Sequence, residues 1–264
     1  MAIVNIVLIF VCSLHITSAI IQNTTTIAKN GNVTAARNRL YKNEVYTTAH
    51  GILTKSEVFR NFSLSETENW MDEISKWKAP KKLEAFFRYY LAGYTDDNLP
   101  LWIAEVGNVS VRQVVEEGER SMDLLEKYGQ KVLLNVFRSL FRNGSPEMSE
   151  IVAIFDFGGF RMSEVTHLPT ITYMMKIMKR YVNVVDACLQ QALLINATFA
   201  VQVLIDRSRP FLGHLLEKVD IYGANKNKWI PVLRRKFSDD LIPPWYGGAK
   251  NFKPVSVFGL NAGF

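Results

Sequence analysis

The sequence predicts an α/β fold, a parallel β-sheet with covering helices, and a small helical subdomain on the N-terminal side. From Leu101 onward, short apolar runs suited to buried strands alternate with amphipathic helical patterns. The stretch from Gln190 to Tyr222 has the pattern of a strand, two helical pieces and a strand, which indicates a crossover unit of a parallel sheet. From residue 39 to residue 87 the pattern is helical and polar.

The size and composition of the chain limit its class. A length of 264 residues suits one large domain with a small accessory part, and 12% aromatic and 21% charged residues exclude global disorder. A net charge of +6 favours acidic partners such as lipid head groups, membrane surfaces or nucleic acid.

The first segment, Met1 to Ala19, is typical of a secretory signal peptide. It has no charged side chain, an apolar run from Ile6 to Cys12 and a small-residue end, so we expect cleavage after Ala19 and a secreted protein. An uncleaved anchor is the alternative, although polar residues interrupt the span that it would need.

Six glycosylation sequons follow, against about two expected by chance. This excess supports the secretory pathway and therefore argues against nucleic acid as a partner. Two of the six are Asn143 and Asn196, and we expect carbohydrate at the other four: Asn23, Asn32, Asn61 and Asn108.

Removal of the signal peptide leaves Cys188 as a single cysteine and therefore no internal disulfide. Since no histidine or basic cluster adjoins it in sequence, a buried apolar cysteine is favoured over a reactive thiol.

The predicted domain boundaries follow changes in pattern. Residues 20–38 form a flexible lead-in, 39–92 the helical subdomain, 93–250 the main domain and 251–264 a C-terminal tail. Within the helical subdomain, Ser63 and Glu66 form a capping box, and an apolar stripe follows.

The main domain begins with turn residues from Gly93 and a strand from Leu101 to Val106. Ser110 then caps a helix, the apolar run from Ile151 to Phe155 predicts a buried parallel strand, and Pro169 lies near the start of another helix.

The central stretch supplies the most informative pattern. A strand from Ala192 to Ile195 precedes a helical piece, Phe199 to Arg207, that is apolar around most of its circumference. Pro210 suits the first position of a second helix, and a last strand runs from Val219 to Tyr222. A helical cover of this kind needs an apolar partner on more than one side.

No motif of a known catalytic or cofactor site occurs: there is no GxSxG, HExxH, CxxC, GxGxxG or phosphate-binding loop. Asp156-Phe157-Gly158 is interpreted as a strand end with a turn, and the remaining histidines lack metal-ligand spacing. We therefore predict no catalytic residue, cofactor or metal.

Several ordered motifs resemble the CRAL-TRIO lipid-binding domain, the family of phosphatidylinositol, tocopherol and retinaldehyde carriers. The resemblance runs from Trp77 to Gly248 and rests on these motifs: IVAIFDFGGF at 151–160, Asn196-Ala197, Arg209-Pro210-Phe211-Leu212, Tyr222-Gly223 and LIPPWYGG at 241–248.

The resemblance implies a mixed, mostly parallel sheet floor and a helical roof that enclose an apolar cavity for one lipid. It also implies a mobile gate helix, which falls on Phe199 to Lys218. Expected gate and pocket residues are Phe199, Val203, Phe211, Leu212 and Leu215. In phosphoinositide-binding relatives an acid and a lysine address the head group, and here they match Asp186 and Lys218. The Tyr-Pro that normally precedes the acid is Val184-Val185, so a solvated acid and a helix-end charge remain the alternative for these two residues.

These features favour a secreted, monomeric carrier of a phospholipid, phosphoinositide or other small lipid, with transient membrane contact. An interaction or scaffold glycoprotein that lost the cavity is the main alternative, and a lipid esterase is the weakest. Because Asn196 should end a buried strand, we expect it to stay unglycosylated. The basic residues from Lys226 to Lys236 form either a solvated face or a weak attraction to anionic membranes.

Overall fold

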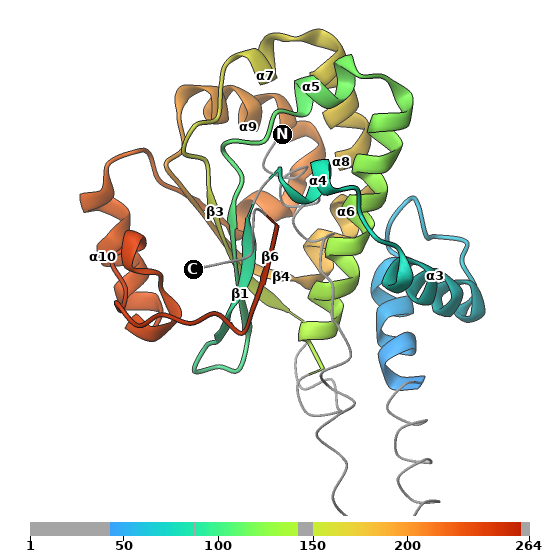
Figure 1. Ribbon diagram of the computed structural model, residues 1–264, viewed down its shortest axis with the longest axis horizontal. Coiled ribbons are helices and arrows are strands. Elements are labelled where there is room, and N and C mark those ends of the chain that lie inside the picture. Colours follow the sequence, from blue (N-terminus) through green and yellow to red (C-terminus); the bar gives the residue numbers. More distant parts are fainter. Residues whose placement is uncertain (1–42, 87, 142–149, 260–264) are drawn as a thin grey trace, which may run out of the picture.

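A six-stranded sheet forms the centre of the protein, in the order β5-β4-β3-β2-β1-β6 (Figure 1). The computed structural model describes residues 43–86, 88–141 and 150–259. The strands β2 to β5 are parallel to one another, and β1 is antiparallel to both β2 and β6. This confirms the predicted mixed, mostly parallel sheet. The strands are β1 (Tyr89–Tyr94), β2 (Pro100–Glu105), β3 (Ile151–Asp156), β4 (Leu189–Ile195), β5 (Val219–Ile221) and β6 (Ser256–Phe258).

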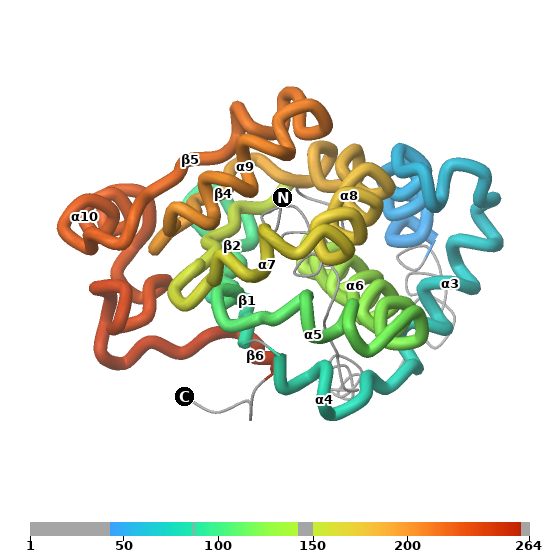
Figure 2. The backbone as a smooth tube through the Cα atoms, turned by 90° about the horizontal axis from the view of Figure 1, so that it is seen from above, coloured from blue at the N-terminus to red at the C-terminus, as the bar shows by residue number. Residues whose placement is uncertain are grey.

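Helices connect the parallel strands and cover both faces of the sheet. After a helix over residues 43–53, they are α3 (Leu64–Lys76), α4 (Lys81–Glu84), α5 (Val111–Glu116), α6 (Glu119–Ser139), α7 (Ser163–Thr166), α8 (Leu168–Cys188), α9 (Phe199–Leu212) and α10 (Lys226–Lys236), with 3-10 helices η2 (Gly213–Lys218), η3 (Asp239–Leu241) and η4 (Pro244–Tyr246). The connecting helices α5 to α9 pack on one face, whereas α10, η3 and η4 cover the other. Figure 2 shows α10 and the long helices α6 and α8 on opposite sides of the strands.

Alternation along the strands separates the two cores. In β3, Ile151, Ala153 and Phe155 face α5 to α9, while Val152 and Ile154 face α10. All five side chains are buried, which explains why the strand reads as a continuous apolar run. The strand β4 begins at Leu189, three residues before the predicted start at Ala192.

Two predicted boundaries are wrong. The limit at residue 92 falls inside β1, which pairs with β2 around the turn at residues 95–99. This strand was not predicted, because the sequence before it is polar and helical in pattern. The residues of β1 are buried on both faces of the sheet. The predicted tail also contains an edge strand, β6, in which Val257 pairs with Tyr90 of β1.

The N-terminal helices do not form a subdomain with a core of their own. Leu53, Phe59, Met71 and Ile74 belong to the same apolar cluster as α6 and α8. The predicted capping box of α3 is confirmed, since the Ser63 hydroxyl accepts from the Glu66 amide and the Glu66 carboxylate accepts from the Ser63 amide. The helices are therefore part of the wall of the main domain.

The expected signal peptide, the lead-in and the sequons at Asn23, Asn32 and Asn143 lie outside the described residues. Within the described ranges, none of the helices has the length and hydropathy that crossing a bilayer requires.

Candidate functional site

The predicted gate corresponds to α9 followed by η2. Its buried side packs toward α7 and α8. The buried residues are Ala200, Val201, Leu204, Ile205, Ser208 and Leu212. The outer side of its middle turns is polar, with Gln202, Asp206 and Arg207 exposed. The expectation of a helix that is apolar around most of its circumference is therefore wrong for these turns.

The five predicted gate and pocket residues divide into two groups. Leu212 and Leu215 are buried, as a pocket role requires. Phe199 is 73% exposed and Phe211 is 39% exposed, so neither lines the interior in this structure, and Val203 is partly buried. Phe199 is the first residue of α9 and Phe211 lies in its last turn, where the helix offers less cover.

Pro210 does not begin a new helix as predicted, because α9 continues through it to Leu212. A proline in this turn leaves the Asp206 carbonyl without its usual amide donor. The Ser208 hydroxyl donates to the carbonyls of Leu204 and Ile205, a contact that tends to bend helices. Gly213 then ends the helix at φ 47°, a left-handed conformation that favours glycine. The junction of α9 and η2 is thus locally weak.

Two small side chains lie next to each other on the sheet beneath this roof. Ala153 of β3 pairs with Ala192 of β4, and both point to the α9 side. The neighbouring strand residues in this row are Trp102 and Val219. Within the described residues, the backbone of α9 packs mainly against α7, α8 and η2 rather than against a strand. Both alanines are fully buried, so the helical roof covers them completely in this structure.

The two residues matched to the head-group site meet in space. The Lys218 Nζ atom lies 3.0 Å from Asp186 Oδ1 and donates to the Asp186 backbone carbonyl at 2.6 Å. Asp186 lies near the C-terminal end of α8, and Lys218 is the last residue of η2. Both side chains are partly exposed, at 42% and 28%. The pair offers a cation and an acid at the end of the gate.

A second polar site anchors the segment after α10, and no sequence pattern predicted it. Asp156 accepts hydrogen bonds from the Tyr246 hydroxyl at 2.7 Å, the Asn196 amide group at 2.7 Å and the Gly158 amide at 2.8 Å. Burial, together with Asp156, holds the pKa of Tyr246 well above its usual range. Asn196 adopts φ 55°, a left-handed conformation that asparagine tolerates. The Asp156-Phe157-Gly158 turn is thus a structural anchor.

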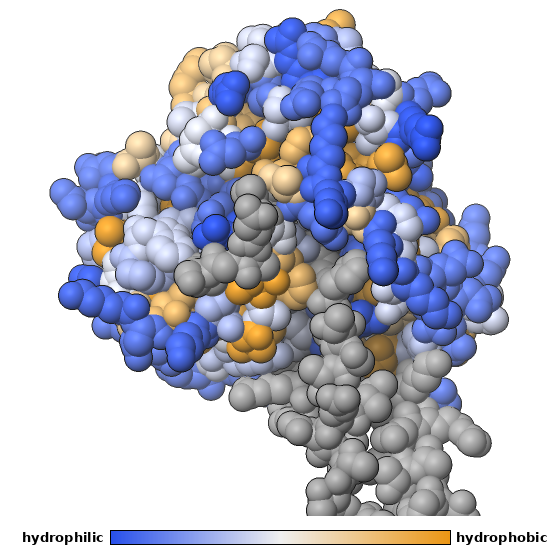
Figure 3. Space-filling model, in the orientation of Figure 1, coloured by the Kyte–Doolittle hydropathy of each residue, from blue (hydrophilic) through white to orange (hydrophobic). Residues whose placement is uncertain are grey.

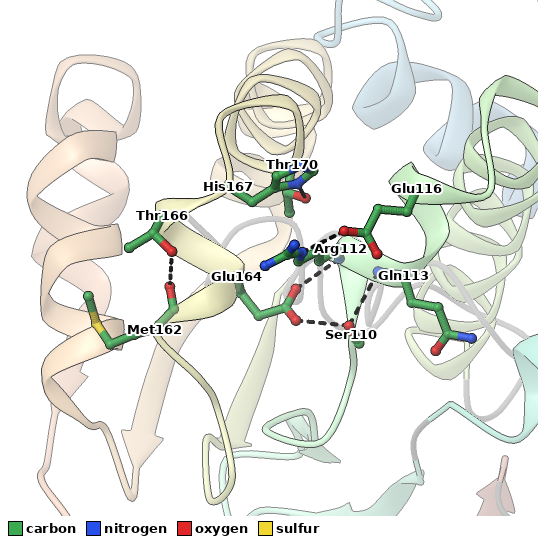
Figure 4. A network of polar contacts seen from close by, with 9 residues as sticks. All are labelled: Ser110, Arg112, Gln113, Glu116, Met162, Glu164, Thr166, His167 and Thr170. Carbon is green, nitrogen blue, oxygen red and sulfur yellow. Dashed lines mark hydrogen bonds and ion pairs between the residues drawn. The ribbon is translucent and has the colours of Figure 1, made fainter.

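Glu164 of α7 supplies another link that no sequence pattern indicated (Figure 4). Its carboxylate accepts from the Ser110 hydroxyl and from the Arg112 amide, both at 2.9 Å. Ser110 also accepts from the Gln113 amide, as the predicted cap requires. The Gln113 side chain donates to Glu117 instead of returning to the cap, so the buried Glu164 completes the N-terminus of α5.

Candidate groups for covalent chemistry lie apart in the described residues. Burial raises the pKa of the Cys188 thiol to about 12, which confirms the expectation of a buried apolar cysteine. His50 contacts Thr67, His167 contacts Thr170, and His214 contacts Glu217. In the ranges that the structure describes, no cluster of three His, Cys, Asp or Glu side chains is placed to hold a metal ion.

The sequons within the described residues differ in their surroundings. Asn61 and Asn108 are exposed. Asn196 is partly buried, and its amide nitrogen already donates to Asp156. A glycan on that nitrogen would have to fit beside the Asp156 contact in a partly buried site.

Comparison with known proteins agrees with this geometry. The family model described as the CRAL/TRIO domain matches residues 61–248. That range contains the strands β1 to β5, the gate, and the Asp186 and Lys218 pair, and it ends two residues after Tyr246. Among solved structures, the crystal structure of Sfh5 is similar to this chain, with 12% sequence identity, a TM-score of 0.49 and coverage of 80% of this chain and 77% of that one.

Proposed function

Because the chain belongs to the CRAL/TRIO domain family of lipid-binding and lipid-transfer domains, we propose that it binds one hydrophobic ligand between the sheet and the α9–η2 segment. The single observation that carries this proposal is the pairing of Ala153 with Ala192 on the face of the sheet that α5 to α9 cover. Both alanines are fully buried, so space for a ligand above them depends on motion of the roof away from the sheet. The surrounding side chains of this core are apolar, which suits an acyl chain or another small lipid.

The free energy of burial suits a carrier. An acyl chain of about 16 carbons gains on the order of 10 kcal/mol from leaving water, at about 0.8 kcal/mol for each CH₂ group. A lipid held in this way leaves slowly unless the protein meets a bilayer. The weak junction at Pro210 and Gly213 supports a gate that opens by motion of α9 against η2.

A phosphate-bearing head group is the ligand class that the Asp186 and Lys218 pair favours. The lysine supplies the positive charge, and the aspartate holds the lysine in place. The altered motif before Asp186 supports a specificity that differs from that of the phosphoinositide-binding relatives.

The proposal includes a secreted, glycosylated monomer that contacts membranes transiently and performs no covalent chemistry. The predicted signal peptide and the exposed Asn61 and Asn108 support secretion and glycosylation. The buried Cys188 and the separated histidines support a role without catalysis.

A matched pair of alanine substitutions tests the ligand site. Ala192→Leu adds volume on the α9 side of the sheet, while Ala92→Leu adds the same volume on the α10 side at another buried alanine. We expect Ala192→Leu to reduce uptake of a fluorescent phospholipid at least about tenfold, because the added side chain occupies the space that the ligand would take, and to lose about 1–3 kcal/mol of stability because Ala192 is fully buried. Ala92→Leu should keep uptake and lose about 1–3 kcal/mol of stability through overpacking. Equal uptake by both variants would contradict the placement of the site.

A further inference from the structure

One buried amide on the side of the sheet that α5 to α9 cover has no polar partner. Asn135 of α6 is 2% exposed, and in the part of the chain that the structure describes neither its amide nitrogen nor its carbonyl oxygen makes a hydrogen bond. Polar side chains normally lie on the surface, where they meet water, as Figure 3 shows for one face of the molecule. A buried amide without partners lowers stability, so its presence calls for a separate explanation.

The polar residues four positions before and after Asn135 on α6 do have partners. Lys131 donates to the backbone carbonyl of Trp77. Ser139 accepts from the indole nitrogen of Trp102 at 3.1 Å. These contacts connect α6 to the segment after α3 and to β2. Asn135 makes no connection of this kind among the described residues, so its polar atoms do not hold the helix in place.

The position of Asn135 borders the proposed ligand site. Ser139 lies one turn later on the same side of α6, and its contact with Trp102 places this side against β2. The helix α6 belongs to the connection that runs back from the carboxyl end of β2 to the start of β3, so the turn with Asn135 is displaced from Trp102 toward Ala104. Three neighbouring strands carry a small side chain on this face: Ala104, Ala153 and Ala192.

The carboxamide of Asn135 limits the chemistry of a partner. Its nitrogen donates and its oxygen accepts, so a single group that satisfies both must itself donate and accept. A hydroxyl group does so without carrying a charge, which suits the apolar side chains of this core. A carboxylate, an ester or an ionised phosphate diester accepts only, and a quaternary ammonium group neither donates an N–H nor accepts.

We propose that Asn135 selects a lipid that carries a hydroxyl group, which binds the carboxamide inside the protein. The inference rests on the proposed carrier function and specifies its ligand further: besides the group that meets Lys218, the ligand has an uncharged hydroxyl in the part that lies against α6. The unpaired amide destabilises the empty protein, and the ligand removes this destabilisation by supplying both contacts. Asn135 is therefore a residue that determines specificity.

Binding of hexadecanol and of its methyl ether to the full chain tests the proposal, because the ether keeps the alkyl chain but has no hydroxyl hydrogen to donate. Competition with a fluorescent lipid measures both affinities. The wild type should bind the alcohol about tenfold more tightly than the ether. Asn135→Leu, which keeps the approximate size of the side chain, should bind the two compounds equally.

Thermal unfolding of the lipid-free protein separates this role from a structural one. Asn135→Leu should keep or raise the Tm, since it removes two unpaired polar groups from the interior. Ser139→Ala is the matched control, because it removes a hydroxyl that has partners one turn away. It should lower the Tm and keep the preference for the alcohol over the ether.

Two outcomes overturn the inference and leave the carrier function intact. One is equal binding of the alcohol and the ether by the wild type. The other is a lowered Tm of lipid-free Asn135→Leu with the preference for the alcohol retained, which would show that the amide makes contacts within the protein. A wild type that binds neither the alcohol, the ether nor the fluorescent lipid would contradict the carrier function, and the inference with it.

Discussion

The ammonium group of Lys218 lies 3.0 Å from the Asp186 carboxylate, although the two residues are 32 positions apart in the sequence. The C-terminal end of α8 and the last residue of η2 bring them together. The pair links the end of the gate to a helix that forms part of the fixed wall. In the proposed function, this is the polar pair that meets the lipid head group.

Substitution of Lys218 tests the role of this pair. Lys218→Met should weaken binding of a phospholipid with an anionic head group about tenfold and leave binding of an uncharged lipid unchanged, because only the anionic lipid uses the ammonium group. A fluorescent-lipid competition assay measures both. Asp186→Asn is the control that keeps the cation. Thermal unfolding of both variants should change by no more than about 1 kcal/mol, as is usual for partly exposed pairs. Equal losses for both lipids would contradict the head-group role.

Pro210 tests the weak junction of the gate. Pro210→Ala restores an amide donor for the Asp206 carbonyl and should stiffen the last turn of α9. We expect lipid exchange with vesicles to become slower, while the amount of lipid bound at equilibrium stays the same. Pro231 lies inside α10 on the other face of the sheet, so Pro231→Ala is a matched control that should leave the exchange rate unchanged. A faster exchange in Pro210→Ala would contradict a gate at this junction.

The contact of Tyr246 with Asp156 should stabilise the closing segment. Tyr246→Phe removes a buried hydroxyl that donates to a carboxylate, and we expect it to lower the free energy of unfolding by about 1–3 kcal/mol. Urea denaturation measures the change. Tyr222→Phe is the control at a partly buried tyrosine and should stay within about 0.5 kcal/mol. The same network predicts that peptide mapping finds Asn196 without a glycan.

Cys188 should be unreactive in the folded protein. Its thiol is fully buried with a pKa of about 12, so almost no thiolate forms at pH 8. Titration with an aromatic disulfide reagent should detect no thiol in the native mature chain and one thiol after denaturation. Rapid reaction of the native thiol would show that the core around α8 opens.

Two glutamates should affect the pH dependence of stability in opposite directions. Burial, reinforced by Asp156 and opposed by Arg88, raises the pKa of Glu105. Its favourable contribution is therefore complete below the unfolded pKa and is lost as the pH rises through the folded value. Hydrogen bonds from the amide and hydroxyl of Ser63 lower the pKa of Glu66, so its contribution is present above the unfolded pKa and is lost as the pH falls.

Thermal unfolding measured between pH 3 and pH 7 checks both signs. This range brackets the unperturbed glutamate pKa of about 4.3. Relative to the wild type, Glu105→Gln should gain stability toward neutral pH, and Glu66→Gln should lose stability there. Parallel pH profiles for the two variants would contradict the assigned environments.

Much of the fold could be predicted because burial leaves a direct pattern in the sequence. The strands β3 and β4 are apolar on both faces, and the cap at Ser63 is a local signal. The strand β1 was missed because its tyrosines and Gly93 follow a polar helical region and resemble a turn. The strand β6 is only three residues long and depends on its pairing with β1.

The site was predictable only in part. The resemblance identified Asp186, Lys218 and the gate, but helical periodicity could not show that Phe199 and Phe211 face outward, since that depends on where α7 and α8 pack. The contacts of Asp156 with Tyr246 and of Glu164 with Ser110 join residues 90 and 54 positions apart. No local spacing reports contacts of that range.

Native mass spectrometry of the protein purified from lipid-rich cells tests the central claim most directly. The account predicts the mass of the chain plus one lipid, with a reduced bound fraction in Ala192→Leu and an unchanged fraction in Ala92→Leu. A uniformly ligand-free chain that also takes up no fluorescent lipid would contradict the carrier function and favour a scaffold that has kept the fold alone.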